Sequence, residues 1–338
     1  MDDPRTAMVR STGHHRLHEV QSSALAVTAR PLHLRGRTTL EDAFRTTLLE
    51  CLAHVAANIA PVIRSRDVEG LHQLRVGLRR LHVAFSAFGE EFRTPALMDL
   101  KARAKAFADA IAPARDLDVF IEELFLPMAD RLGHDEAFKM LRARAEEARQ
   151  QAWDEATAHI SSPEFAVFQD DVAAAAETRS WLGGQDIAVD LKARLAMRVP
   201  VKSAAAPMMD EHWMRVRKRG RRLKSLEQRE CHRLRIALKR LRYATEFYGP
   251  LYKKKAVKRY LDRLKKLQDL LGCINDVGQV RAVLGRLVAD QAVSAHVQAD
   301  LYFTAGLING WHRARAERLS KKALRRWEKF KRLEPFWA

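Results

Sequence analysis

Two stretches of the chain carry histidine and arginine at a spacing that would place them on one face of a helix. The first, HQLRVGLRRLH, covers residues 72–82, and the second, HRLRIALKRLR, covers residues 232–242. At about 100° per residue, these polar residues fall in a stripe roughly 80° wide, with leucines on the opposite side. The first stripe consists of His72, Arg75, Arg79 and His82, and the second stripe consists of His232, Arg235, Lys239 and Arg242.

A stripe of this kind is suited to binding a chain of phosphate groups. Arginine offers several fixed N–H donors that match phosphate oxygens. Like charges stacked along a helix destabilise it unless an anion or an acidic neighbour compensates. The alternative is an amphipathic helix whose charged face is only solvated, and that interpretation fits the lysine run at 253–258 better than it fits the stripes.

The two stretches belong to a longer repeat with a constant offset of 160 residues. Eight of the 18 positions from His72 to Gly89 are identical to those from His232 to Gly249. The same offset, without a gap, pairs Arg103 with Arg263, Lys105 with Lys265, Asp109 with Asp269, and Asp116 with Asp276. A constant offset over about 50 residues indicates an internal duplication. Lys105 and Lys265 therefore join the candidate anion-binding residues.

The pattern of apolar residues predicts an all-α protein. Helical periodicity recurs along the chain, and no sustained alternation typical of a strand occurs. Helices are expected near residues 38–60, 67–89, 95–111, 115–131, 134–159 and 163–182, with the last helices running from roughly 277 to 330.

Boundary residues suggest how these helices are organised. Thr38 with Glu41, and Ser225 with Gln228, have the spacing of capping boxes, while Gly272 and Gly278 are expected to flank breaks. We predict a disordered tail over residues 1–37, an N-terminal helical half over 38–182, a connecting segment over 183–209 and a C-terminal helical half over 210–332.

Charge is distributed unevenly between the halves. The net charge is +18, and residues 210–338 contain 33 Lys+Arg against 13 Asp+Glu, which leaves 27 against 29 in residues 1–209. A field of that sign concentrates anions. The chain has three cysteines without a C-x-x-C motif, and it shows no secretory signal and no apolar run of about 20 residues. These features predict a cytoplasmic protein without membrane contact.

The two motifs and their flanks resemble a known family, the CHAD (conserved histidine α-helical) domain. The resemblance rests on VEGLHQLRVGLRRLHVAFSAFG and ECHRLRIALKRLRYATEFYGPLY, with ARDLDVF and LKKLQDLLGCINDVGQV behind them, and it covers residues 38–330. It implies two pseudo-symmetric four-helix bundles from an internal duplication, with a basic central cleft or pore that binds inorganic polyphosphate. The implied contacts come from His72, Arg75, Arg79 and Arg80 in one half, and from His232, Arg235, Lys239, Arg240 and Arg242 in the other.

His82 stands where relatives commonly have arginine, which would make the first-half contact pH-sensitive. Many relatives also carry a triphosphate-tunnel catalytic domain of the CYTH type, which needs an E-x-E-x-K signature, and no E-x-E occurs here. We therefore expect a stand-alone, non-catalytic polyphosphate-binding domain with no cofactor or metal. Polyphosphate granules and polyphosphate-metabolising enzymes are its expected partners.

Two other functions stay open from the residues alone. A metal-dependent enzyme of phosphate chemistry would use the histidines with Asp109, Asp116, Asp269 and Asp276, although no H-x-x-x-H or H-E-x-x-H motif occurs. Nucleic-acid or generic polyanion binding fits the charge, but recognition of single strands usually needs exposed aromatic residues. Nucleic acid is therefore expected to bind only weakly.

Overall fold

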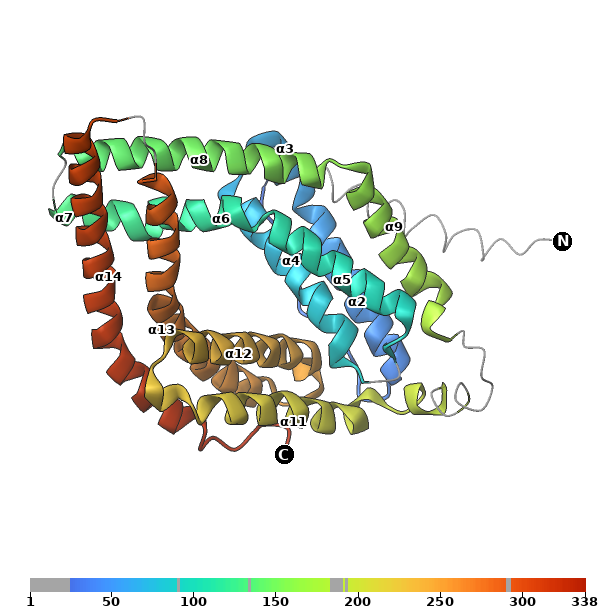
Figure 1. The fold of residues 1–338 in the computed structure, drawn as a ribbon. Coiled ribbons are helices and arrows are strands. Elements are labelled where there is room, and N and C mark those ends of the chain that lie inside the picture. Colours follow the sequence, from blue (N-terminus) through green and yellow to red (C-terminus); the bar gives the residue numbers. More distant parts are fainter. Residues whose placement is uncertain (1–24, 90–91, 133–134, 183–190, 192–193, 290–292) are drawn as a thin grey trace. The chain divides into compact units, whose positions relative to one another are not determined.

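The computed structural model describes residues 25–89, 92–132, 135–182, 191, 194–289 and 293–338. Helices account for nearly all regular structure in these ranges (Figure 1), and they contain no strand, only an isolated bridge between Thr39 and Pro200. The predicted all-α class is confirmed. Residues 1–24 of the expected tail and residues 183–190 of the expected connecting segment lie outside the described ranges.

The chain forms two compact units, each assembled from two stretches of sequence. Unit 1 comprises Met1–Arg115 and Trp153–Ala204, and unit 2 comprises Asp116–Ala152 and Ala205–Ala338. The helices α6 (Ala112–Val119) and α8 (Glu136–Ile160) each contribute residues to both units. Each unit contains one of the two motif helices. The arrangement as two four-helix bundles around a basic cleft stays a prediction.

Unit 1 is built around α2 (Leu40–Ala57) and the first motif helix, α4 (Val68–Ala87). α2 packs against α4 and α9 (Pro163–Thr178), and α5 (Pro95–Ala110) packs against α4 and α9. Short α3 (Ile59–Ser65) and the 3-10 turn η3 (Ser180–Leu182) complete the unit. Phe44 is central to the core, with ring centroids 4.2 Å from Phe92 and 5.0 Å from Trp181.

Unit 2 is built around the second motif helix, α12 (Gln228–Tyr248), and two long helices. α13 (Lys254–Leu287) packs against both α12 and α14 (Ala295–Phe330), and α11 (Val201–Gly220) precedes α12 in the chain. The 3-10 turns η4 (Leu223–Ser225) and η5 (Gly249–Leu251) flank α12. Between the two stretches of unit 1 lie the π-helical turn η2 (Phe120–Phe125) and α7 (Leu126–Leu132).

Several predicted helix boundaries are wrong by a few residues. Thr39, not Thr38, is the N-cap of α2, because its hydroxyl accepts from the backbone N–H of Asp42 at 3.0 Å. Glu227 is the N-cap of α12, while the Ser225 hydroxyl accepts from the Glu227 N–H within the preceding turn. Thr94 and Ser162 are the N-caps of α5 and α9, and each is followed by proline in the first turn.

The breaks expected at Gly272 and Gly278 do not occur, because α13 continues through both. Gly278 instead permits a close approach. A Cβ at this position would lie 1.6 Å from Nε2 of Gln228, at the first turn of α12. The packing of α13 on its neighbours therefore outweighs the cost of about 1 kcal/mol that each interior glycine brings to a helix.

Residues 25–37, part of the expected tail, belong to unit 1 and pack against its helices. The backbone N–H of Val27 donates to Oδ1 of Asn58 at 2.9 Å, and Nδ2 of Asn58 donates to the Val27 carbonyl at 2.9 Å. Leu32 and Leu34 are buried.

The stretch Leu40–Ser65 is long and apolar enough to cross a membrane by length and composition, which differs from the expectation that the chain has no such run. However, 67% of its most apolar window is buried inside the structure.

Candidate anion-binding helices

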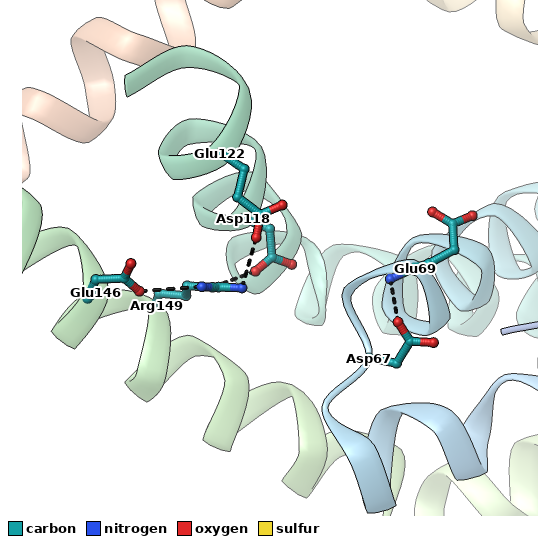
Figure 2. Close-up of polar contacts among 6 residues, drawn as sticks. All are labelled: Asp67, Glu69, Asp118, Glu122, Glu146 and Arg149. Carbon is teal, nitrogen blue, oxygen red and sulfur yellow. Dashed lines mark hydrogen bonds and ion pairs between the residues drawn. The ribbon is translucent and has the colours of Figure 1, made fainter. Parts of the chain in front are cut away.

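The first stripe lies on the less buried face of α4. The opposing leucines Leu71, Leu74, Leu78 and Leu81 are fully buried, whereas the four stripe residues are half-buried. Asp67 fixes the start of the helix, because its Oδ1 accepts from the Glu69 N–H at 3.0 Å (Figure 2). The predicted division of this helix into a leucine face and a cation face is therefore present.

Electrostatic repulsion is concentrated around the first histidine of this stripe. Burial lowers the pKa of His72 below its usual 6.5, and the cations Arg115, Arg75 and Arg79 lower it further, against an opposing effect of Glu69. His72 is therefore neutral at pH 7 and can offer a hydrogen bond. The site around it already holds several positive charges, which an anion would compensate.

His82 differs from His72 in being tied to a neighbouring helix. Its Nδ1 lies 3.1 Å from the carbonyl oxygen of Lys101 on α5, so Nδ1 donates when it carries the proton. The ring orientation is thereby set by the backbone of α5.

Arg80 does not lie with the first stripe. It is 6% exposed, on another face of α4, beside the buried His54 of α2. Burial, and then Arg80, lower the pKa of His54 to about 4. Nε2 of His54 lies 3.1 Å from the Val27 carbonyl and 3.2 Å from Oε1 of Gln73. The structure therefore places Arg80 in an interior polar cluster rather than on the accessible face.

The second stripe repeats this arrangement on α12 with greater exposure. Leu234, Leu238 and Leu241 are fully buried, His232 is exposed, and the other three stripe residues are half-buried. Nδ1 of His232 lies 2.9 Å from Oδ1 of Asn275 on α13. Each stripe therefore has one histidine attached to the next long helix of its own unit.

The last cation of the second stripe is held by its neighbours on α12. Nε of Arg242 lies 3.4 Å from Oε1 of Glu246, and its guanidinium carbon lies 4.9 Å from the centre of the Tyr243 ring. Tyr243 is 4% exposed, so its aromatic face supports the arginine and is not available to stack on a base.

An acidic residue of α13 accompanies the second stripe. Burial raises the pKa of Asp276 from 3.8 to about 6, Glu123 raises it as well, and the cations Arg235 and Arg315 oppose the rise. Asp276 is the repeat partner of Asp116. The carboxylate is half-buried, and Arg235 of the second stripe is one of the cations that favour its ionised form.

The remaining predicted residues are separate from the stripes. Lys105 and Lys265 are exposed, and Nζ of Lys105 lies 2.5 Å from Oδ2 of Asp109 on the same helix. Arg240, the repeat partner of Arg80, lies off the second stripe and lines a cavity between α11 and α12. Sequence reasoning did not single out this cavity, although the basic run RVRKRGRRLK at 215–224 supplies part of it.

A second polar cluster was not foreseen from the sequence. Arg149 of α8 bonds three carboxylates of unit 2, with its Nε 2.7 Å from Oδ1 of the fully buried Asp118 (Figure 2). Its other nitrogens lie 3.3 Å from Glu122 and 3.4 Å from Glu146. This arginine joins α8 to α6 and to the π-helical turn η2.

Among the described residues, no group of three or more His, Cys, Asp or Glu side chains could hold a metal ion.

Comparison with known proteins adds a family and two structures. The CHAD domain model matches residues 46–285. The crystal structure of the CHAD domain from the plant Ricinus communis matches at 27% identity with a TM-score of 0.75, covering 93% of this chain and 99% of that one. PptA from Streptomyces chartreusis matches at 15% identity with a TM-score of 0.62, covering 86% of this chain and 100% of that one, which is a likeness of fold. No curated protein matches.

Proposed function

The chain belongs to the CHAD domain family, and we propose that it binds inorganic polyphosphate through the first and second stripes without catalysing a reaction. The observation that carries the proposal is the duplicated stripe itself. In both motif helices the leucine face is fully buried, while the opposite face keeps its cations and histidines partly accessible.

The physical state of these cations supports a role in binding. Arg75, Arg79, Arg235 and Lys239 are half-buried, so their side chains have lost part of their freedom before any ligand arrives. Several cations also surround His72 and lower its pKa. A polymer of phosphates would relieve this repulsion and would find arginine donors already held near their binding positions.

The repeat also favours an extended ligand over a single ion. The stripe recurs at the same four positions of two helices, with Arg75 matched to Arg235 and Arg79 matched to Lys239. A linear polymer presents the same charged group many times and can satisfy every equivalent position. Binding of this kind depends strongly on salt, because each phosphate contact releases a counterion.

The proposal is tested by competition binding with stripe variants. Labelled long-chain polyphosphate is displaced by unlabelled polyphosphate or by single-stranded RNA or DNA, at several salt concentrations. Arg75→Ala with Arg235→Ala removes one arginine from each stripe, and about tenfold or more weaker binding is expected from losing two charge-assisted contacts. Lys254→Ala with Lys255→Ala removes the same charge from the exposed lysine run and should change the affinity little.

Two results would contradict the proposal. One is equal weakening by the stripe and lysine-run variants with unchanged helicity, which would make the stripes part of a general basic surface. The other is equal competition, per phosphate, by nucleic acid at physiological salt, which would make polyphosphate an accidental ligand. A separate measurement concerns the expected association with polyphosphate granules, because retained affinity for granules in the stripe variant would exclude the stripes as the means of that association.

A further inference from the structure

A cavity of about 470 Å³ lies between α11 and α12 within unit 2. This volume falls in the range of sites for small ligands. Five of its eight lining residues are lysine or arginine and none is acidic. The lining consists of His212, Arg215, Lys218, Arg219, Arg233, Ile236, Ala237 and Arg240. We call this the α11–α12 pocket.

The cations of the α11–α12 pocket are only partly neutralised by nearby acids. Arg215 pairs with Glu211 on the same helix, and Nη1 of Arg233 lies 2.7 Å from Oε1 of Glu230. Partial burial and the nearby Arg215 lower the pKa of Arg240. Because protonated arginines repel one another across the pocket, an anion placed between them would stabilise this region.

A buried histidine lines the same pocket. His212 is 3% exposed, and its Nδ1 is buried without a hydrogen-bond partner among the described residues. Burial, then Arg215 and Arg240, lower its pKa to about 4, so the imidazole is neutral at pH 7. A buried polar atom that lacks a hydrogen-bond partner destabilises the folded state, so a ligand that supplied a partner would be favoured at this position.

The α11–α12 pocket lies on a different face of α12 from the second stripe. At about 100° per residue, the α12 residues that line the pocket are centred about 130° around the helix from the stripe residues. Arg240 lines the pocket, whereas Arg235 and Lys239 belong to the stripe. Two ligands could therefore contact α12 at the same time.

Unit 1 contains a counterpart of the helix face that lines the α11–α12 pocket, and in unit 1 that face is covered by another segment. One earlier helix in each unit, α2 in unit 1 and α11 in unit 2, carries a buried histidine with a pKa of about 4, and the repeat partners Arg80 and Arg240 are among the cations that lower it. In unit 1, His54 contacts Gln73 and the carbonyl of Val27, so the segment at residues 25–34 covers the face.

The two copies differ in charge at this face. The repeat partner of Gln73 is Arg233. After the buried histidine, unit 1 reads HVAANIAPVI (residues 54–63), whereas unit 2 reads HWMRVRKRGR (residues 212–221). An apolar, covered surface in unit 1 therefore corresponds to an open, cationic pocket in unit 2.

We propose that the α11–α12 pocket binds a compact ligand with two or more linked phosphate groups, at a site separate from the stripes. The arginine forks match phosphate oxygens in pairs, and five cations exceed what a single phosphate needs. The ligand is either a free short oligophosphate or the end of a longer chain. Both sources present the same linked phosphates to the pocket.

The test measures pyrophosphate and tripolyphosphate binding to the full chain by calorimetry. Lys218→Ala with Arg219→Ala is expected to weaken tripolyphosphate binding about tenfold or more. Lys254→Ala with Lys255→Ala, the charge-matched control, is expected to leave it within about twofold. If the natural ligand is a free oligophosphate, long-chain polyphosphate will displace tripolyphosphate no better per molecule than unlabelled tripolyphosphate does. If the natural ligand is the end of a longer chain, each end of a long-chain polyphosphate molecule will occupy one pocket.

Hydrogen exchange gives a second readout that does not depend on a variant folding. Tripolyphosphate should slow exchange in peptides covering residues 212–222, which contain pocket residues and no stripe residue, in the wild type and in the Arg75→Ala, Arg235→Ala variant. Equal weakening by the pocket variant and its control would overturn the proposal, as would absence of protection in these peptides. The proposal survives a failure of polyphosphate binding at the stripes, because the two sites use different faces.

Discussion

Replacing Asp276 by asparagine should stabilise unit 2 at neutral pH. The folded-state pKa of this carboxyl is raised from 3.8 to about 6. A raised carboxyl pKa means that the folded state binds the proton more tightly than the unfolded state. The ionised form is therefore a cost, fully present above pH 6 and absent below about pH 3.8. A shift of about two pKa units corresponds to ~3 kcal/mol.

His212 has the opposite dependence in the same unit. Its folded-state pKa is lowered from 6.5 to about 4, so the stability it supports is present above pH 6.5 and is lost as the pH falls towards 4. In the wild type, acidification relieves the cost at Asp276 while it imposes the cost at His212. The two effects oppose each other, and His312 of the same unit, whose pKa burial also lowers, acts in the same direction as His212. Asp276→Asn should therefore expose the histidine effect.

The assay is urea unfolding from pH 4 to 8, with hydrogen exchange in α12 and α13 to follow unit 2 separately. Asp276→Asn should raise the free energy of unfolding by up to ~3 kcal/mol at pH 7.5, with the gain vanishing near pH 4. Asp269→Asn, at an exposed position of the same helix, should change it by less than about 0.5 kcal/mol at every pH. A gain that does not vary with pH, or destabilisation at pH 7.5, would refute the reasoning.

Two further predictions concern packing and the buried ion pair. Gly220→Ala should lower the free energy of unfolding by about 1–3 kcal/mol, because its Cβ would lie 1.9 Å from an indole carbon of α14. Gly285→Ala, in open space on α13, should raise the free energy of unfolding by about 1 kcal/mol. Thermal unfolding of the two variants should therefore show changes of opposite sign. Arg149→Ala should cost about 3–5 kcal/mol by leaving the buried Asp118 carboxylate without its arginine. Arg142→Ala, exposed on the same helix, should cost little, and equal losses for the two arginines in urea unfolding would show that the buried pair contributes nothing special.

Helical periodicity was sufficient to predict the stripes, because burial on a helix follows directly from the spacing of apolar residues. Leu74 and Leu234 are fully buried as the pattern required. The same periodicity already separated Arg80 and Arg240 from the stripes, but the family resemblance grouped them together. In the structure Arg80 is buried and Arg240 lines a different pocket.

Features that depend on long-range packing could not be predicted. The buried Asp118 is paired with Arg149 of α8, which lies 31 residues further along the chain. The π-helical turn after Asp118 has no local sequence signature. Gln228 packs over Gly278 within the unbroken α13, a contact that neither local sequence reveals. The error at Thr38 is of another kind, since two adjacent threonines offer equal local signals and the hydrogen bond to Asp42 selects the second.

The unequal charge of the two halves argues that the stripes are not the whole of the binding surface. The C-terminal 129 residues carry a balance of +20 against −2 for the rest, yet the second stripe exceeds the first by a single cation, Arg242 in place of His82. Nearly all the excess positive charge therefore lies away from the stripes. Part of it lines the α11–α12 pocket, where arginine replaces Gln73 and a basic helix replaces an apolar one. Duplication with divergence at this face would give one half of the protein an anion site that the other half has closed.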